Sequence, residues 1–190
     1  MSGAMLRTFI AVKIPPTPGL RDLHARLSQL GDRFRPAALD NLHVTLKFLG
    51  DTAESKVPEI ESLLRRVLEG RPEVQIRLAG VGAFPHERRP SVLWVGLAGG
   101  DLLCEMAGDL ERELAGLGFP PEGRAFHPHL TLLRIKMRPP DALFAILKDE
   151  ARAELGAVTV EAVEFIESQL GPRGSRYTTL ASIRLGKSDG

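Results

Sequence analysis

The sequence predicts an α+β protein of two pseudo-symmetric lobes, each an antiparallel-rich β-sheet backed by helices, with a central cleft between them. Its 190 residues are 43% hydrophobic and 26% charged, which is typical of a globular chain with a sizeable core. Strand and helix patterns also recur in the same order in two halves, approximately 6–82 and 91–186. We therefore expect residues 1–190 to form a single bilobal domain that arose by internal duplication.

Strands are expected where β-branched and aromatic residues form short apolar or alternating runs bounded by Gly, Pro, Asn or Asp. The turn Gly171-Pro172-Arg173-Gly174 joins the last two of them as a hairpin. A loop is expected at 82–90. The predicted strands are 6–14, 42–49, 74–81, 92–97, 129–134, 158–170 and 177–185.

Helices are expected where apolar residues recur every three or four positions between charged ones. Leu20, Leu23 and Leu27 show this spacing in the first of them. The predicted helices are 19–34, 53–68, 101–117 and 141–155. Each half then runs strand, helix, strand, helix, strand.

The second strand of each half contains the same short motif, His43-Val-Thr45-Leu in the first and His129-Leu-Thr131-Leu in the second. Residues i and i+2 of a strand point to one face, so each His projects beside its Thr while the apolar neighbours point to a core. A polar face on a central strand is costly to bury unless it has a use. We interpret the two motifs as the halves of one active site in the cleft.

Two imidazoles can divide into a neutral base and a protonated acid near neutral pH. Threonine hydroxyls are hydrogen-bond donors that suit phosphoryl oxygens. The sequence places no Asp/Glu cluster for a metal, and we expect neither a metal nor a cofactor. The set therefore indicates cleavage of a phosphodiester, with Thr45 and Thr131 holding the phosphate.

The chain resembles the 2H phosphoesterases, a family defined by two His-x-Thr/Ser motifs. Within that family it is most similar to the bacterial RNA 2′,3′-cyclic phosphodiesterases, once called 2′-5′ RNA ligases. The resemblance covers nearly the whole chain and is carried by RTFIAVKIP, NLHVTLKFLG, FHPHLTLLR and ESQLGPRGSRYTTL.

This resemblance implies an RNA or nucleotide substrate that ends in a 2′,3′-cyclic phosphate and is hydrolysed to a 2′-phosphate. It also implies that His43 donates a proton to the departing 3′ oxygen and that His129 accepts a proton from water. Arg134 belongs to the family's motif, and the resemblance implies that it contacts the phosphate.

Strict alternation conflicts with this role, because Arg134 lies three residues after Thr131 and should point away from the site. Only a strand end or a β-bulge would bring it round. By the same parity Lys47 shares the face of the site, where it could contact the substrate or simply be a surface lysine, and Phe48 should point to the core. Phe9 and Tyr177 could stack on a base or simply pack in the sheet.

Several alternatives remain open. One is a 2′-5′ RNA ligase, or a phosphodiesterase for another cyclic or 2′-5′-linked nucleotide. Another is a nucleotide-binding module without catalysis. His127 shares the face of His129, so three imidazoles with His43 could also form a zinc site.

Composition also bears on location and partners. The single cysteine, Cys104, and the lack of a signal peptide or long apolar run lead us to expect a cytoplasmic protein without membrane contact. A net charge of +1 favours a small or terminal anion over a long nucleic acid. We expect a monomer.

Overall fold

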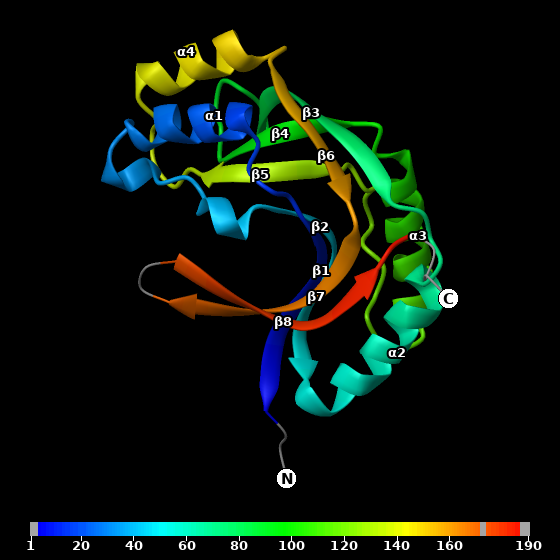
Figure 1. Cartoon of the computed structure of the whole chain (residues 1–190). Helices are drawn as coiled ribbons and strands as arrows, with labels where there is room; N and C mark the ends of the chain where they lie inside the picture. Colours follow the sequence, from blue (N-terminus) through cyan, green and yellow to red (C-terminus); the bar gives the residue numbers. More distant parts are fainter. Residues whose placement is uncertain (1–3, 172–173, 187–190) are drawn as a thin grey trace.

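The computed structural model describes residues 4–171 and 174–186, which form two four-stranded antiparallel sheets and four α-helices. The strand order is β2-β1-β7-β8 in the first sheet and β5-β4-β3-β6 in the second (Figure 1). The predicted α+β class is confirmed. The strands are β1 Met5–Lys13, β2 His43–Ala53, β3 Val74–Phe84, β4 Val92–Ala98, β5 His129–Arg134, β6 Glu154–Val160, β7 Ala162–Gly171 and β8 Gly174–Arg184. The helices are α1 Pro18–Ser28, α2 Val57–Leu68, α3 Asp101–Ala115 and α4 Asp141–Glu150.

Each sheet combines strands from both halves of the sequence. β3 comes from the first half but pairs with β4 and β6 of the second. β7 and β8 come from the second half, and β7 pairs with β1. The strands with the two motifs, β2 and β5, were expected to be central, and this was wrong, because each occupies an edge of its sheet. The two halves are thus interlocked by exchanged strands.

The chain crosses between the sheets at Glu161. The single strand predicted for 158–170 is wrong, because the segment is divided into β6 in one sheet and β7 in the other. The backbone carbonyl of Glu161 accepts a hydrogen bond from the N–H of Leu185 at 2.8 Å. No glycine or proline marks this crossing, so the alternating pattern runs through it without a visible break.

Other predicted boundaries shift by a few residues. β2 continues past Gly50, whose positive φ of 70° is accommodated opposite Thr8 in β1. β3 extends to Phe84, into the predicted loop. The helix predicted for 19–34 ends at Ser28, and the one predicted for 141–155 ends at Glu150 because the chain enters β6.

The helices cover the sheet faces that lie opposite the two histidines. α2 and α3 contact each other and the sheet of β2 and β8, while α1 and α4 contact β6 and β3 (Figure 1). The main apolar core lies beneath them, and it includes Val44 and Leu130 from between the His and Thr of each motif. α1 starts after Thr17, whose side chain accepts a hydrogen bond from Leu20 N at 3.2 Å.

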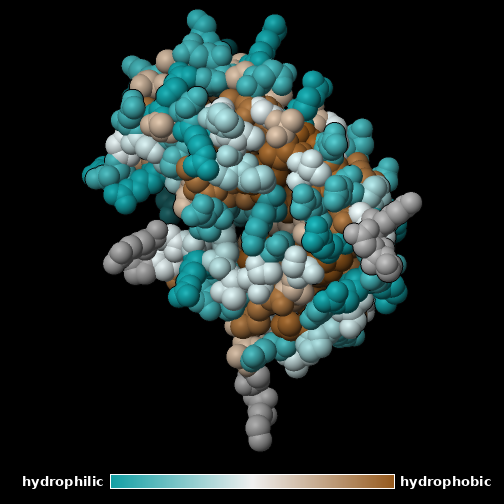
Figure 2. Space-filling view, in the orientation of Figure 1, coloured by the Kyte–Doolittle hydropathy of each residue, from teal (hydrophilic) through white to brown (hydrophobic). Residues whose placement is uncertain are grey.

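The outer surface over α1 and α4 is mainly hydrophilic, and the molecule is notched between this part and the projecting β7–β8 hairpin (Figure 2). A second, smaller apolar cluster lies on the opposite face of the first sheet from the main core, and consists of Phe9, Ala11 and Ile166 with Tyr177 packed against it. Among the described residues no helix is long and apolar enough to cross a membrane.

Candidate active site

The two motifs open two neighbouring edge strands. His43 is the first residue of β2 and His129 the first residue of β5, and these strands contact each other although they belong to different sheets. The segment before β2 is also tied to β5, since Ala37 N donates to Leu132 O at 2.7 Å. The fold therefore brings together two segments that are far apart in the sequence.

Each motif contains a β-bulge at the same place. In β2, Thr45 is opposite Ala11 while Lys47 is opposite Ile10, so Leu46 has no partner of its own in β1. In β5, Thr131 is opposite Trp94 while Leu133 is opposite Leu93, so Leu132 is the extra residue in the same way. Both strands have the same burial order over their first six residues: half-buried, buried, half-buried, buried, buried, exposed.

The bulge in β5 turns Arg134 onto the same face as Thr131. These residues lie opposite Val92 and Trp94, which are two positions apart in β4 and so share a face. Strict alternation would place Arg134 on the face opposite to Thr131. The extra residue, Leu132, shifts the alternation by one position, so Arg134 points to the face of the site. The guanidinium lies close enough to His43 for its charge to lower the pKa of that imidazole.

The bulge in β2 reverses the predictions for Lys47 and Phe48, and both were wrong. Lys47 is 2% exposed and points to the core side, where Nζ donates to Pro120 O and to the Glu111 carboxylate, both at 2.8 Å. Phe48 is 53% exposed and faces the site, with its ring centroid 6.0 Å from that of Phe9. Phe48 therefore occupies in the first motif the position that Arg134 occupies in the second.

Both histidines are oriented by the backbone carbonyl two residues earlier. His43 Nδ1 donates to Asn41 O at 2.7 Å, and His129 Nδ1 donates to His127 O at 2.8 Å. A carbonyl can only accept a hydrogen bond, so Nδ1 carries the hydrogen in each ring. The Nε2 atoms remain for chemistry, as an acceptor when the ring is neutral and as a donor when it is protonated.

Aromatic rings support both imidazoles from the side. The His43 ring lies 5.0 Å from Phe9 and 5.3 Å from Tyr177, between ring centroids, the latter edge-on at 90°. The His129 ring meets Phe84 edge-on at 5.2 Å. Phe9 is 3% exposed, so it packs under His43 and is not available to stack on a base.

The two threonines flank this arrangement. Thr45 and Thr131 are half-buried and lie on the same faces as His43 and His129. In the part of the chain that the structure describes, neither hydroxyl has a side-chain or backbone hydrogen-bond partner. Both can therefore donate to an oxygen of a bound ligand.

The comparison with protein families agrees with this paired architecture. A family model described as LigT like phosphoesterase matches residues 12–94 and again 97–177, once in each half of the chain. The chain belongs to the LigT-like phosphoesterase family.

Relatives and solved structures support the assignment across the whole length. The chain is 35% identical to an RNA 2′,3′-cyclic phosphodiesterase of Aeropyrum pernix over 171 residues, covering 89% of this chain and 96% of that one. It is 34% identical to the Methanothermobacter thermautotrophicus protein of the same name, covering 95% and 99%. The TT0787 structure of Thermus thermophilus superimposes with a TM-score of 0.82 at 26% identity, covering 96% and 99%, and Escherichia coli LigT complexed with 3′-AMP with 0.71 at 25% identity, also covering 96% and 99%.

Electrostatics distinguish the first histidine of this LigT-like phosphoesterase. Burial of the imidazole lowers the pKa of His43 below its ordinary value of 6.5, and the positive charge of Arg134 lowers it further. The hydrogen bond to Asn41 O raises the pKa, and it is a smaller effect than burial but a larger one than the charge of Arg134. The free protein therefore holds His43 mainly neutral at pH 7.

His127 contributes its carbonyl to the site, while its own side chain is exposed. Over residues 4–171 and 174–186 no three His, Cys, Asp or Glu side chains are arranged to hold a metal ion. The donor set of the site is instead two imidazoles, two hydroxyls and one guanidinium.

The sequence interpretation missed three side chains that border the site. Lys13 lies opposite His43 in β1 and is paired with Glu164 at 3.1 Å, and with His43 and Tyr177 it lines a small pocket. Phe84 and Trp94 lie on the face of His129. The signal for Lys13 was a cation at the end of an apolar strand, but its register against β2 could not be read from the sequence.

Proposed function

We propose that this LigT-like phosphoesterase hydrolyses the 2′,3′-cyclic phosphate at the end of an RNA or nucleotide and leaves a 2′-phosphate. The observation that carries the proposal is the matched pair of imidazoles. Each is anchored through Nδ1 to the carbonyl two residues earlier, and each lies on the same strand face as the threonine two residues later. The names of the relatives at 35% and 34% identity support the same substrate class.

In the proposed reaction, water attacks phosphorus while Nε2 of His129 accepts its proton. The bond between phosphorus and the 3′ oxygen breaks, and protonated Nε2 of His43 donates its proton to that oxygen. The product has a 2′-phosphate and a 3′-hydroxyl, so atoms and charges balance. Each proton transfer of this kind contributes about 10²–10⁴-fold to the rate.

Binding of the substrate prepares His43 for this role. A proton donor must be protonated, yet the lowered pKa of His43 keeps it neutral in the free protein. The phosphate carries a negative charge, which pairs with Arg134 and favours the charged imidazolium. Thr45 and Thr131 donate hydrogen bonds to the phosphoryl oxygens and align phosphorus between the two rings. All five residues come from one chain, so a monomer suffices.

Substitution of each histidine tests the proposal. We expect His43→Ala and His129→Ala each to lower kcat on adenosine 2′,3′-cyclic phosphate by at least about 10²-fold, with an unchanged thermal unfolding curve. His127→Ala is the matched control, because it removes an exposed imidazole but keeps the carbonyl that holds His129. It should retain wild-type turnover.

The identity of the product separates the alternatives. ³¹P NMR should show only the 2′-phosphate, in buffer with EDTA as well as without it. Accumulation of a 2′-5′ linkage when a 5′-hydroxyl oligonucleotide is added would favour a ligase. Binding without turnover in the wild-type protein would favour a binding module, and loss of activity in EDTA that zinc restores would favour a metal site.

A further inference from the structure

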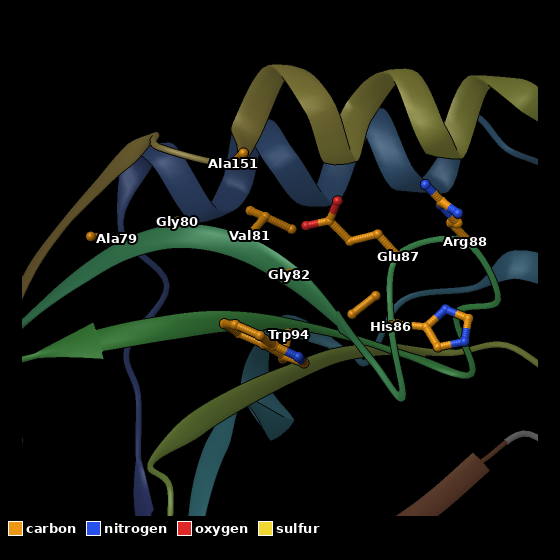
Figure 3. Close-up of a pocket in the computed structure, with 10 residues that line it drawn as sticks. Ala79, Gly80, Val81, Gly82, His86, Glu87, Arg88, Trp94 and Ala151 are labelled. Atoms are coloured by element: carbon orange, nitrogen blue, oxygen red, sulfur yellow. The ribbon is translucent and has the colours of Figure 1, made fainter.

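A cavity of about 970 Å³ lies on the second sheet beside the active site, and the mechanism above does not use it. Its floor is the end of β3 from Ala79 to Ala83, together with Trp94 of β4. Its walls are the loop residues His86, Glu87 and Arg88 and, on the far side, Ala151 after α4 (Figure 3).

The edge of β3 is open along this cavity. β6 pairs with β3 only from Val74 to Ala79, and the last tie on that side is Gly80 N to Ala153 O at 2.8 Å. Within the described residues no strand pairs with this side of β3 from Val81 to Phe84. Backbone N–H and C=O groups there are available to the polar edge of a ligand.

Glycines allow Trp94 to reach from the site face into the cavity. Gly82 lies directly opposite Trp94, and a Cβ on Gly82 would come within 2.4 Å of Trp94 Cζ2. A Cβ on Gly96 would likewise lie 3.5 Å from Trp94 Cζ3 and 2.7 Å from the backbone of Ala79. The indole therefore occupies space that side chains at these positions would fill.

A continuous row of rings leads from the catalytic histidine to the cavity. The Phe84 ring lies 5.2 Å from the His129 ring and 5.3 Å from the Trp94 ring, between centroids. Phe84 is 39% exposed, so its face is accessible to a ligand. Trp94 lies opposite Thr131 and lines the cavity itself. A ligand bound at the histidines could therefore extend directly into it.

The chemistry of the lining suits a nucleotide. Exposed aromatic rings stack on bases of any sequence, and a guanidinium pairs with a phosphate. Arg88 supplies the positive charge, His86 adds an imidazole that can hydrogen-bond, and the Glu87 carboxylate can accept hydrogen bonds from ribose hydroxyls. The volume lies at the upper end of the range for pockets that enclose drug-sized ligands, which is more than a single base requires.

We propose that this cavity binds the nucleotide on the 5′ side of the one that carries the cyclic phosphate. The inference rests on the proposed function and deepens it, because it makes the end of an RNA strand, rather than a free cyclic mononucleotide, the preferred substrate. The base of this nucleotide stacks on the Phe84–Trp94 surface, and its phosphate lies against Arg88.

The test compares kcat/KM for cytidylyl-(3′-5′)-adenosine 2′,3′-cyclic phosphate with kcat/KM for adenosine 2′,3′-cyclic phosphate. We expect the dinucleotide to be preferred by about ten-fold or more, as one stacked base and one phosphate contact would provide. Arg88→Ala should reduce this preference and lower the slope of log(kcat/KM) against log salt by about 0.7 for the dinucleotide only. Arg89→Ala is the matched control, since Arg89 is the neighbouring exposed arginine but does not line the cavity.

A second variant tests stacking separately from charge. Trp94→Leu should bring the ratio of the two kcat/KM values close to one, whatever its effect on either value alone. Equal kcat/KM for the two substrates in the wild-type protein would overturn the inference and leave the proposed function intact. An unchanged ratio in both Arg88→Ala and Trp94→Leu would overturn it as well. Absence of turnover on both substrates would instead refute the proposed function, and this inference with it.

Discussion

His43 and Arg134 affect each other's charge at the centre of the site. A guanidinium that helps to bind the phosphate also disfavours the protonated form of the imidazole that must act as the acid. The conflict disappears once an anion lies between them. Burial of the imidazole, with a smaller contribution from Arg134, therefore disfavours a charged His43 until an anionic substrate binds.

Removal of the Arg134 charge should raise the pKa of His43 in the free protein. The reason is that Arg134 is one of the two causes that lower it, so Arg134→Gln leaves only burial opposed by the Asn41 carbonyl. An NMR titration of the His43 ring nitrogens measures this directly. Arg138→Gln, an exposed arginine in the segment after β5, is the control and should leave the titration unchanged. A pKa of His43 that stays constant or falls in Arg134→Gln would contradict this electrostatic account.

The same pKa shift affects stability in acid. Because the folded-state pKa of His43 is lower than the unfolded value, the unfolded chain binds the proton more readily. The contribution of neutral His43 is present above pH 6.5 and is lost as the pH falls through the lower, folded-state pKa. Arg134→Gln should therefore lose less stability than the wild type between pH 7 and pH 5, as measured by denaturant unfolding.

At the scale of the strand, the two bulges decide which side chains reach the site. Alternation correctly predicted the faces of the His and Thr in each motif, because those residues precede the bulge. It failed at Lys47 and Phe48, and it misdirected Arg134, because a bulge shifts parity for every later residue. Neither Leu-Lys nor Leu-Leu differs from ordinary strand sequence, so the sequence carried no local signal for the extra residue.

Lys47 fixes the bulge in β2, and its removal should affect both stability and activity. Lys47→Met keeps the apolar stem but leaves Pro120 O and Glu111 without the ammonium that binds them. We expect a loss of about 1–3 kcal/mol in the free energy of unfolding, below that of a fully buried pair because the Glu111 side chain is 23% exposed. Turnover should also fall, since Thr45 and Phe48 flank the bulge.

An exposed ion pair whose glutamate also lies on α3 provides the comparison for Lys47→Met. Arg66 and Glu113 interact at 2.9 Å across α2 and α3, with side chains 66% and 47% exposed. Arg66→Met should change the unfolding free energy by less than about 0.5 kcal/mol and leave turnover unaffected. If Lys47→Met behaved like Arg66→Met in both measurements, the buried lysine would not anchor the bulge.

At the scale of the molecule, the two halves depend on each other through exchanged strands. The order of elements in each half was predicted from periodicity, and the α+β class followed from it. The exchange could not be predicted, because β3 and β7 have ordinary alternating sequences that do not specify a partner. Glu161 shows the same limit, since the chain changes sheets there within an unbroken apolar-polar pattern.

Separation of the chain between Glu87 and Arg88, in the loop from β3 to β4, tests this interdependence. Fragment 1–87 lacks the β7–β8 strands that cover β1, and fragment 88–190 lacks the β3 strand that joins β4 to β6. Each fragment alone should give the poorly dispersed NMR spectrum of an unfolded chain, and an equimolar mixture should recover native dispersion. A folded spectrum from either fragment alone would show that the halves are independent.

The most direct test of the central claim is a crystal structure of the protein with a nucleoside 2′-phosphate bound. The account predicts that Nε2 of His43 and Nε2 of His129 each lie within about 3.2 Å of an oxygen on the same phosphate, with Arg134 in contact with that group. A phosphate that touches only one imidazole, or that binds away from both motifs, would contradict it.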